Sequence, residues 1–144
     1  ARELYKDLFL ENIEEFRGRF EQALLLLRQE KWEDASLELN TCIELCPRFA
    51  DVYNYLGVAL AEQDELAEAC VAFEKSVELN ADYIVAWLNL AYARFAMGDN
   101  ESSAEALREV LRREPDNAPG LHLESTLTPG PEPAPESRAG VQED

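Results

Sequence analysis

The sequence has few of the residues on which catalysis and cofactor binding depend. It contains one histidine, His122, and six glycines among 144 residues. A single histidine leaves no Ser-His-Asp or Cys-His arrangement with a supporting partner, and no glycine-rich phosphate loop is present. The acidic residues Glu101, Glu105 and Glu109 recur at the spacing of a solvated helix face and not as an acid–base pair. These absences predict a protein that is not an enzyme and holds no cofactor.

Basic residues are also scarce. The chain has 13 Lys and Arg against 30 Asp and Glu, a net charge of −17. Nucleic acid is excluded as a partner because phosphate binding needs a basic stripe, and none is visible. The charge either serves solubility or attracts a basic protein or peptide. The second reading points to the segment from Asp51 to Tyr83, where Lys75 is the single base.

Cysteine pairs and long apolar runs are missing too. The three cysteines, Cys42, Cys46 and Cys70, form no CxxC pair, so we expect free thiols that pack as small apolar residues and bind no metal. Free thiols are typical of a reducing compartment, and a cytoplasmic location is expected. No apolar run approaches the length of about 20 residues that a membrane span needs, so direct membrane insertion is not expected.

The sequence does contain a regular pattern with a step of 34 residues. It is carried by small residues, by large apolar residues and by residues near predicted helix ends: Ala23, Gly57 and Ala91; Leu39, Phe73 and Leu107; Pro47, Ala81 and Pro115. A fixed period of this length indicates a solenoid, in which each unit buries its apolar face only against a neighbour. The pattern predicts an all-α fold and favours binding over catalysis.

Each unit is predicted to form two helices. In the middle unit an apolar stripe runs from Tyr53 to about Gln63, a turn follows at Asp64 and Glu65, and a second stripe ends near Asn80. The next unit repeats this arrangement. Short turns force the paired helices to pack antiparallel.

These residues resemble the signature of the tetratricopeptide repeat family. The match rests on two series, namely Tyr53, Leu56, Gly57, Leu60, Ala69 and Phe73, then Trp87, Leu90, Ala91, Leu107 and Pro115. The resemblance implies a right-handed α-solenoid of three repeats, at 16–49, 50–83 and 84–117. The first repeat is degenerate, with Arg19 and Gln22 where an aromatic residue and a leucine are expected. Arg94 also replaces a large apolar residue, and we expect it to reach solvent.

Three segments lie outside the repeats. Residues 1–15 continue an apolar stripe and are predicted to form a helical extension that caps the first repeat, either as one long helix or as two with a bend near Gly18. The alternative is a surface for self-association or partner docking. Residues 118–127 are predicted to form a short capping helix, and the acidic, proline-rich residues 128–144 a disordered tail.

By resemblance, the first helices of the repeats line a concave groove. The implied inward residues are Arg17, Phe20, Leu24, Leu27 and Arg28; Asp51, Asn54, Val58, Ala61 and Glu62; Val85, Leu88, Asn89, Tyr92, Phe95 and Ala96. Most are apolar, which suits an amphipathic helix or an apolar peptide. Asn54 is expected to hold a peptide backbone, and Asp51 and Glu62 to meet Lys or Arg.

The leading hypothesis is therefore a small scaffold or adaptor that holds a protein partner in an apolar, acid-rimmed groove. Two alternatives remain open: a secretion or assembly chaperone that masks apolar client segments, and a structural unit that self-associates through residues 1–15. Family members that grip an acidic C-terminus use Lys, Asn and Arg across the groove. This chain has Leu24, Tyr55, Val85 and Asn89 there, so capture of an EEVD-like tail is not expected.

Overall fold

The computed structural model describes the backbone of residues 2–129 and the side chains of residues 10–129. Within this range the chain is entirely helical, without a strand, which confirms the all-α prediction. The disordered tail predicted over residues 128–144 lies, apart from its first two residues, outside the described residues. The seven helices are α1 (Arg2–Arg28), α2 (Trp32–Leu45), α3 (Ala50–Glu62), α4 (Leu66–Leu79), α5 (Ile84–Ala96), α6 (Asn100–Arg113) and α7 (Ala118–Leu127).

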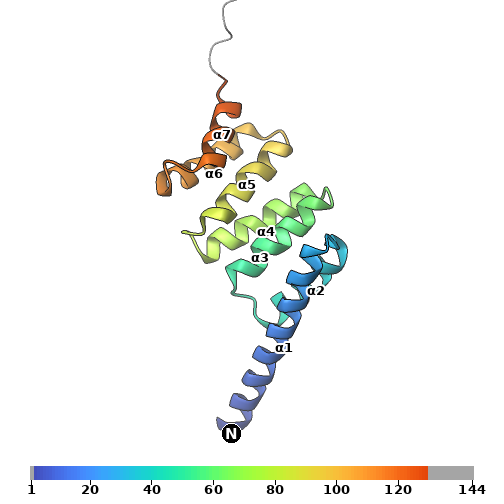
Figure 1. Cartoon of the computed structure of the whole chain (residues 1–144). Coiled ribbons are helices and arrows are strands. Elements are labelled where there is room, and N and C mark those ends of the chain that lie inside the picture. The colour runs from blue at the N-terminus through green and yellow to red at the C-terminus, as the bar shows by residue number, and fades with distance from the viewer. Residues whose placement is uncertain (1, 130–144) are drawn as a thin grey trace, which may run out of the picture.

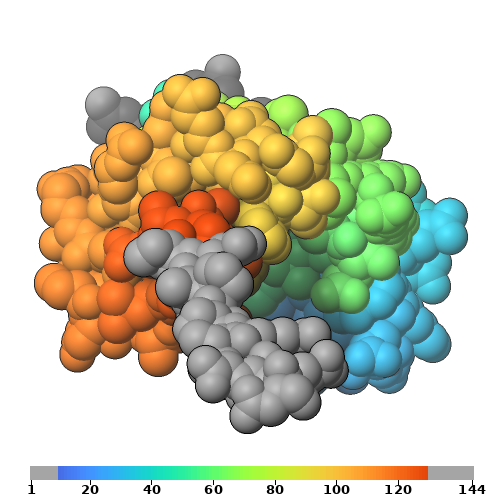
Figure 2. Space-filling view, turned by 90° about the horizontal axis from the view of Figure 1, so that it is seen from above, coloured from blue at the N-terminus to red at the C-terminus, as the bar shows by residue number. Residues whose placement is uncertain are grey.

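The helices follow the repeat of the sequence. Helices α2, α4 and α6 begin at residues 32, 66 and 100, and α3, α5 and α7 begin at residues 50, 84 and 118. Helix α1 pairs with α2, α3 with α4, and α5 with α6, while α7 packs on α6 and α5. The pairs lie side by side in chain order (Figure 1 and Figure 2). The solenoid predicted from the sequence is confirmed.

Helix α1 is one unbroken helix of 27 residues that runs through Gly18. The alternative of two helices with a bend there is therefore wrong. Its N-terminal half extends beyond the other helices (Figure 1). The described residues of its C-terminal half are anchored by Ala23, which is fully buried, and by the ring of Phe16, whose centroid lies 4.9 Å from that of Phe49.

The helices of a pair approach closely where a small residue meets a large one. A Cβ atom placed on Gly57 would lie 2.4 Å from Cε1 of Phe73, whose ring is 2% exposed. The first and third pairs have an alanine at the Gly57 position, and there the Phe73 position is Leu39 or Leu107. The larger phenylalanine side chain is therefore paired with glycine, and the smaller leucine side chains are paired with alanine. Helix contact of this kind fixes the spacing within each pair.

The buried residues form two clusters that meet in the middle of the stack. One cluster is built around Leu39 and Val52 from α2 and α3, and the other around Phe73, Leu90 and Val110 from α4, α5 and α6. Leu60 packs against both clusters. The core is thus continuous from the first pair to α7, as the nearest-neighbour stacking of a solenoid requires.

The turns between repeats are tied down by an aromatic side chain. Tyr53 Oη donates a hydrogen bond to the carbonyl of Pro47 at 2.9 Å, and Trp87 Nε1 donates to the carbonyl of Ala81 at 2.7 Å. The two bonds occupy the same place in successive repeats. In the first repeat this place holds Arg19, which instead pairs with Glu38 at 3.3 Å. Each aromatic donor satisfies a turn carbonyl that has no helical partner.

Arg94 was expected to reach solvent, but most of its side chain is packed between neighbouring helices. Its guanidinium donates to the carbonyl of Ser102 at 3.0 Å and lies 3.3 Å from a carboxylate oxygen of Glu74, and its side chain is 19% exposed. The aliphatic stem covers apolar surface while the charged head finds polar partners. Arg94 therefore joins α5 to both α4 and α6.

We expect Gly57→Ala to destabilise the protein, because its methyl group would collide with the Phe73 ring. Overpacking of a core typically costs about 1–3 kcal/mol, which exceeds the helix-propensity gain of about 1 kcal/mol for Gly→Ala. Chemical denaturation measures the free energy of unfolding. Phe73→Leu in the Gly57→Ala background should recover part of the loss, since it recreates the Ala–Leu pairing of the other repeats.

Gly18→Ala is the matched control, because nothing lies within 4 Å of the added Cβ. It should leave stability unchanged or raise it. Equal effects of Gly18→Ala and Gly57→Ala would contradict the close-approach explanation.

The three cysteines should differ in reactivity. Burial, with the nearby Glu38 charge, raises the pKa of Cys42 to about 11, and burial also raises the pKa of Cys70. Cys46 is only half-buried. Because the thiolate is the reactive form, iodoacetamide at a pH of about 8 should label Cys46 first in the folded protein. Mass spectrometry of the peptides would show this order, and equal labelling of all three before unfolding would contradict it.

Candidate functional site

The first helices of the repeats enclose two adjoining hollows. The α3–α5 hollow has a volume of about 370 Å³ and is lined mainly by α3 and α5, with Leu66 and Phe73 from α4. The α1–α3 hollow has a volume of about 570 Å³ and is lined by residues of α1, α3 and α5, with Trp32 of α2. Val58 and Asn89 line both hollows. The two hollows together are called the groove below.

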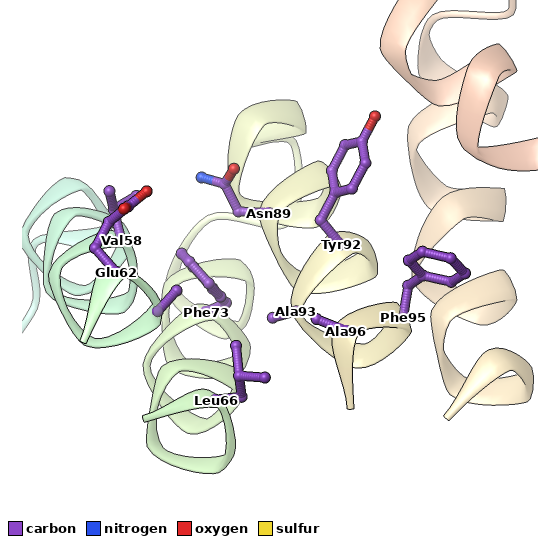
Figure 3. A pocket seen from close by; sticks show the side chains of 10 residues that line it. Val58, Glu62, Leu66, Phe73, Asn89, Tyr92, Ala93, Phe95 and Ala96 are labelled. Carbon is purple, nitrogen blue, oxygen red and sulfur yellow. The ribbon is translucent and has the colours of Figure 1, made fainter. Parts of the chain in front are cut away.

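The α3–α5 hollow is apolar, with polar groups on its edges. Val58 and Glu62 of α3 face Asn89 and Tyr92 of α5, and Phe73 lies between the two sides (Figure 3). Helical spacing puts residues four apart on one face, so Val58 and Glu62 project to the same side of α3. The hollow can therefore accept an apolar side chain beneath a carboxylate and an amide.

A buried polar network lies at the centre of the groove. Asn54 is 3% exposed, its Nδ2 donates to Tyr83 Oη at 3.3 Å, and its Oδ1 accepts from Asn89 Nδ2 at 2.9 Å. Burial, together with the nearby Asp51 charge, raises the pKa of Tyr83 to about 12, so its hydroxyl stays protonated. The network ties α3 to α5 and to the turn between the repeats. The Asn54 amide expected to hold a peptide is thus used within the protein.

The structure brings most of the implied site residues together. Those that line one or both hollows are Leu24, Leu27, Arg28, Asn54, Val58, Ala61, Glu62, Val85, Asn89, Tyr92, Phe95 and Ala96. Phe95 is placed on the far side of α5 from Val58 and Glu62 (Figure 3). Tyr92 also donates from its hydroxyl to the carbonyl of Pro119 at 3.1 Å. The groove is therefore connected directly to α7.

Four residues of the implied set, Arg17, Phe20, Asp51 and Leu88, line neither hollow. The ring of Phe20 lies 5.8 Å from that of Phe16 and 5.9 Å from that of Tyr55, measured between centroids. Leu88 packs against the core cluster of α4 to α7, and Asp51 is exposed near Tyr83. Aromatic neighbours thus hold Phe20 away from the groove, a packing arrangement that helical spacing alone does not specify.

Sequence reasoning missed five lining residues, Ala93 of α5 and then Trp32, Leu66, Phe73 and Tyr83. The last four come from second helices and from a turn, whereas the resemblance directs attention to first helices. Phe73 and Leu66 belong to the apolar stripe of α4, which predicts core residues. The stripe does not indicate that part of each side chain also lines the groove. The position of Tyr83, directly before the first helix of the third repeat, is the one feature of the sequence that indicates a place near the groove.

The charges along the groove differ between its two hollows. Glu62 lines the α3–α5 hollow and Arg28 lines the α1–α3 hollow. The expected acidic rim is thus present at Glu62, while Asp51 lies outside the lining. A charged ligand would be oriented by this difference, because each end favours the opposite sign.

Other kinds of site find little support in the described residues. Side chains of residues 10–129 form no group of three or more His, Cys, Asp or Glu placed to hold a metal ion. Among the helices described, none is both long enough and apolar enough to cross a membrane.

Asn54→Ala should destabilise the fold, because it leaves the buried ends of Tyr83 and Asn89 without a partner. An unsatisfied buried polar group typically costs about 1–3 kcal/mol. The measurement is the unfolding free energy from chemical denaturation. Asn89→Ala should also destabilise the fold, because it leaves the buried Oδ1 of Asn54 without its donor. An Asn54→Ala protein as stable as wild type would contradict a structural role for the network.

Two tetratricopeptide repeat models match the chain, one at residues 1–84 and another at residues 59–127. The chain is 31% identical over 102 residues to the tetratricopeptide repeat domain-containing protein PYG7, chloroplastic, of Arabidopsis thaliana; the match covers 68% of this chain and 34% of that protein. It is 30% identical over 87 residues to the Hsp70-Hsp90 organizing protein of Triticum aestivum, covering 60% of this chain and 15% of that protein. The chain thus spans a minor part of each relative.

Solved structures show the same fold. The Arabidopsis OM64 TPR domain superposes with a TM-score of 0.78 at 21% identity, covering 81% of this chain and 97% of that one. The first TPR of Spaghetti (RPAP3), bound to the HSP90 peptide SRMEEVD, gives a TM-score of 0.77 at 20% identity, covering 80% and 91%. The tetratricopeptide repeat model that matches residues 1–84, more than half of the chain, shows that the chain belongs to the tetratricopeptide repeat family, and the 34-residue step of the helices agrees with it.

Proposed function

We propose that the chain is a non-catalytic protein–protein interaction module, a small adaptor whose groove holds a peptide or amphipathic helix of a partner protein. The observation that carries this proposal is the pair of adjoining, mainly apolar hollows that share Val58 and Asn89. Hollows of this kind take alternate or i, i+3/i+4 apolar side chains of an extended or helical ligand. Membership of a repeat family whose structures include peptide complexes supports the same function.

The groove also suggests what the ligand contains. Two apolar side chains would fill the two hollows, and Glu62 favours a Lys or Arg near the α3–α5 hollow. Arg28 favours an acidic group near the α1–α3 hollow. The free edge of Asn89, which is half-buried, is the amide best placed to contact a ligand backbone. Charges of this kind set orientation and specificity more than affinity.

The acidic C-terminal peptide of the Spaghetti complex is not the proposed ligand. The positions that the family uses to grip such a tail hold Leu24, Tyr55, Val85 and Asn89 in this chain. Leu24 and Val85 line the α1–α3 hollow as apolar side chains. A carboxylate placed there would lose its hydration and would meet the single cation Arg28 in place of a set of cations, which is unfavourable for a tail with several carboxylates.

The alternatives raised from the sequence receive less support. No observation on the described residues favours a client-masking chaperone or self-association through residues 1–15. A cytoplasmic location remains a prediction, supported by the three free thiols; the relative PYG7 is described as chloroplastic.

Selection of peptides from a random displayed library tests the groove. Peptides selected on the wild-type chain should bind at least about tenfold more weakly to Val58→Asp, because the new carboxylate stands where both hollows meet. Fluorescence anisotropy measures the affinities. The peptide SRMEEVD serves as a comparison and should bind no better than about 1 mM.

Val71→Glu is the control variant, since Val71 is 66% exposed on α4 and lines neither hollow. It should bind the selected peptides as wild type does. The proposed ligand class would be overturned if Val58→Asp left the affinity of the selected peptides unchanged, or if SRMEEVD bound tightly.

A further inference from the structure

A third hollow lies on a different face of α3 from the groove. It has a volume of about 360 Å³ and is lined by Asn40 and Ile43 of α2, by Tyr53, Leu56 and Leu60 of α3, and by Glu68, Val71, Ala72 and Lys75 of α4. None of these residues lines either hollow of the groove. We call it the outer hollow. It sits between the second helices of the first two repeats.

Two exposed apolar side chains mark the surface around the outer hollow. Val71, which lines it, is 66% exposed, and Leu37 is 64% exposed; these are the two most exposed large apolar residues of the described side chains. Leu37 lies one helical turn before Asn40, so both are on the same side of α2. Leu37 and Val71 hold the same place in successive repeats, where the third repeat has Glu105. The fold therefore does not require an apolar residue at this position of the repeat.

Carboxylates gather at one end of the same surface. The hydrogen bond and the negative charge of Glu68, with a further contribution from the charge of Glu33, raise the pKa of Glu65. Glu68 lines the outer hollow, and Glu33 lies one helical turn before Leu37 on the same side of α2. The bond from Gln63 Nε2 to Ser36 Oγ, at 3.0 Å, joins the end of α3 to the start of α2.

Lys75, the basic residue at the outer hollow, is paired with a different carboxylate from those of Glu33, Glu65 and Glu68. Lys75 lines the hollow, and its Nζ lies 3.4 Å from a carboxylate oxygen of Glu78 on the same helix. The surface therefore combines an open apolar hollow, two projecting apolar side chains and an end that carries Glu33, Glu65 and Glu68. Like charges crowded in this way favour an incoming cation.

We propose that the outer hollow, with Leu37 and Val71, docks a basic amphipathic helix of a partner protein. Apolar side chains at i and i+3 or i+4 of that helix enter the outer hollow and cover Val71 and Leu37. Its Lys or Arg side chains face Glu33, Glu65 and Glu68. The argument for this occupant is charge complementarity. The surface is separate from the groove, so a partner can use it whether or not the groove is filled.

An NMR titration of the isotope-labelled full chain tests the proposal. The probe is a leucine–lysine amphipathic helical peptide of about four turns, which is long enough to present i, i+3, i+4 and i+7 anchors. The titration is run on the Val58→Asp variant as well as on wild type, so that binding in the groove does not contribute. Amide shifts are expected around Leu37, Tyr53 and Val71 in both proteins.

Two comparisons separate docking from general attraction to an acidic protein. A scrambled peptide of the same composition, without an apolar face, should bind at least about tenfold more weakly at an ionic strength of about 0.15 M. Val71→Lys, which replaces an apolar contact by a charge of the same sign as the peptide's lysines, should weaken binding by about tenfold or more. Because the side chain is exposed, the fold should be unchanged.

The opposite results would overturn the proposal. These are equal affinity for the scrambled peptide, unchanged affinity in the Val71→Lys variant, or no shift at Leu37, Tyr53 and Val71 in the Val58→Asp protein. None of them bears on the library peptides that test the groove, so the failure of one proposal is distinguishable from the failure of the other.

Discussion

The close approach of two helices at a small residue is the constraint on which the rest of the structure depends. Where Gly57 meets the Phe73 ring, α3 and α4 are held at a fixed separation, and an alanine facing a leucine does the same in the other pairs. A constant separation makes each pair a unit that stacks on the next with the same geometry. The first helices then fall side by side, and the groove forms between them.

The helices could be predicted from the sequence because the 34-residue step reports directly on packing. Tyr53 and Trp87, for example, recur at this step and make the same bond to the turn before them. The partners of polar side chains could not be predicted in this way. Asn54 binds residues 29 and 35 positions away, and Arg94 binds two neighbouring helices. Such contacts depend on how helices from different repeats meet.

The candidate site was predictable to the extent that it follows the helical period. Val58 and Glu62 of α3, and Asn89 and Tyr92 of α5, project into the groove as the repeat pattern implies. Phe20 departs from the pattern because neighbouring rings hold it. A period specifies the direction of a side chain on an ideal helix, whereas its final position also depends on competition for apolar surface.

Helix α7 occupies the place of a fourth first helix, and no second helix follows it within residues 2–129. It is held by few buried residues, chiefly Gly120 and Leu123. A helix with so few buried residues opens locally at a lower free energy than the middle of the stack, so its amides should exchange with solvent sooner. Because the Tyr92 hydroxyl is bonded to the carbonyl of Pro119, each opening of α7 also breaks this bond. Local opening of α7 thus affects how freely the Tyr92 side chain can move in the groove.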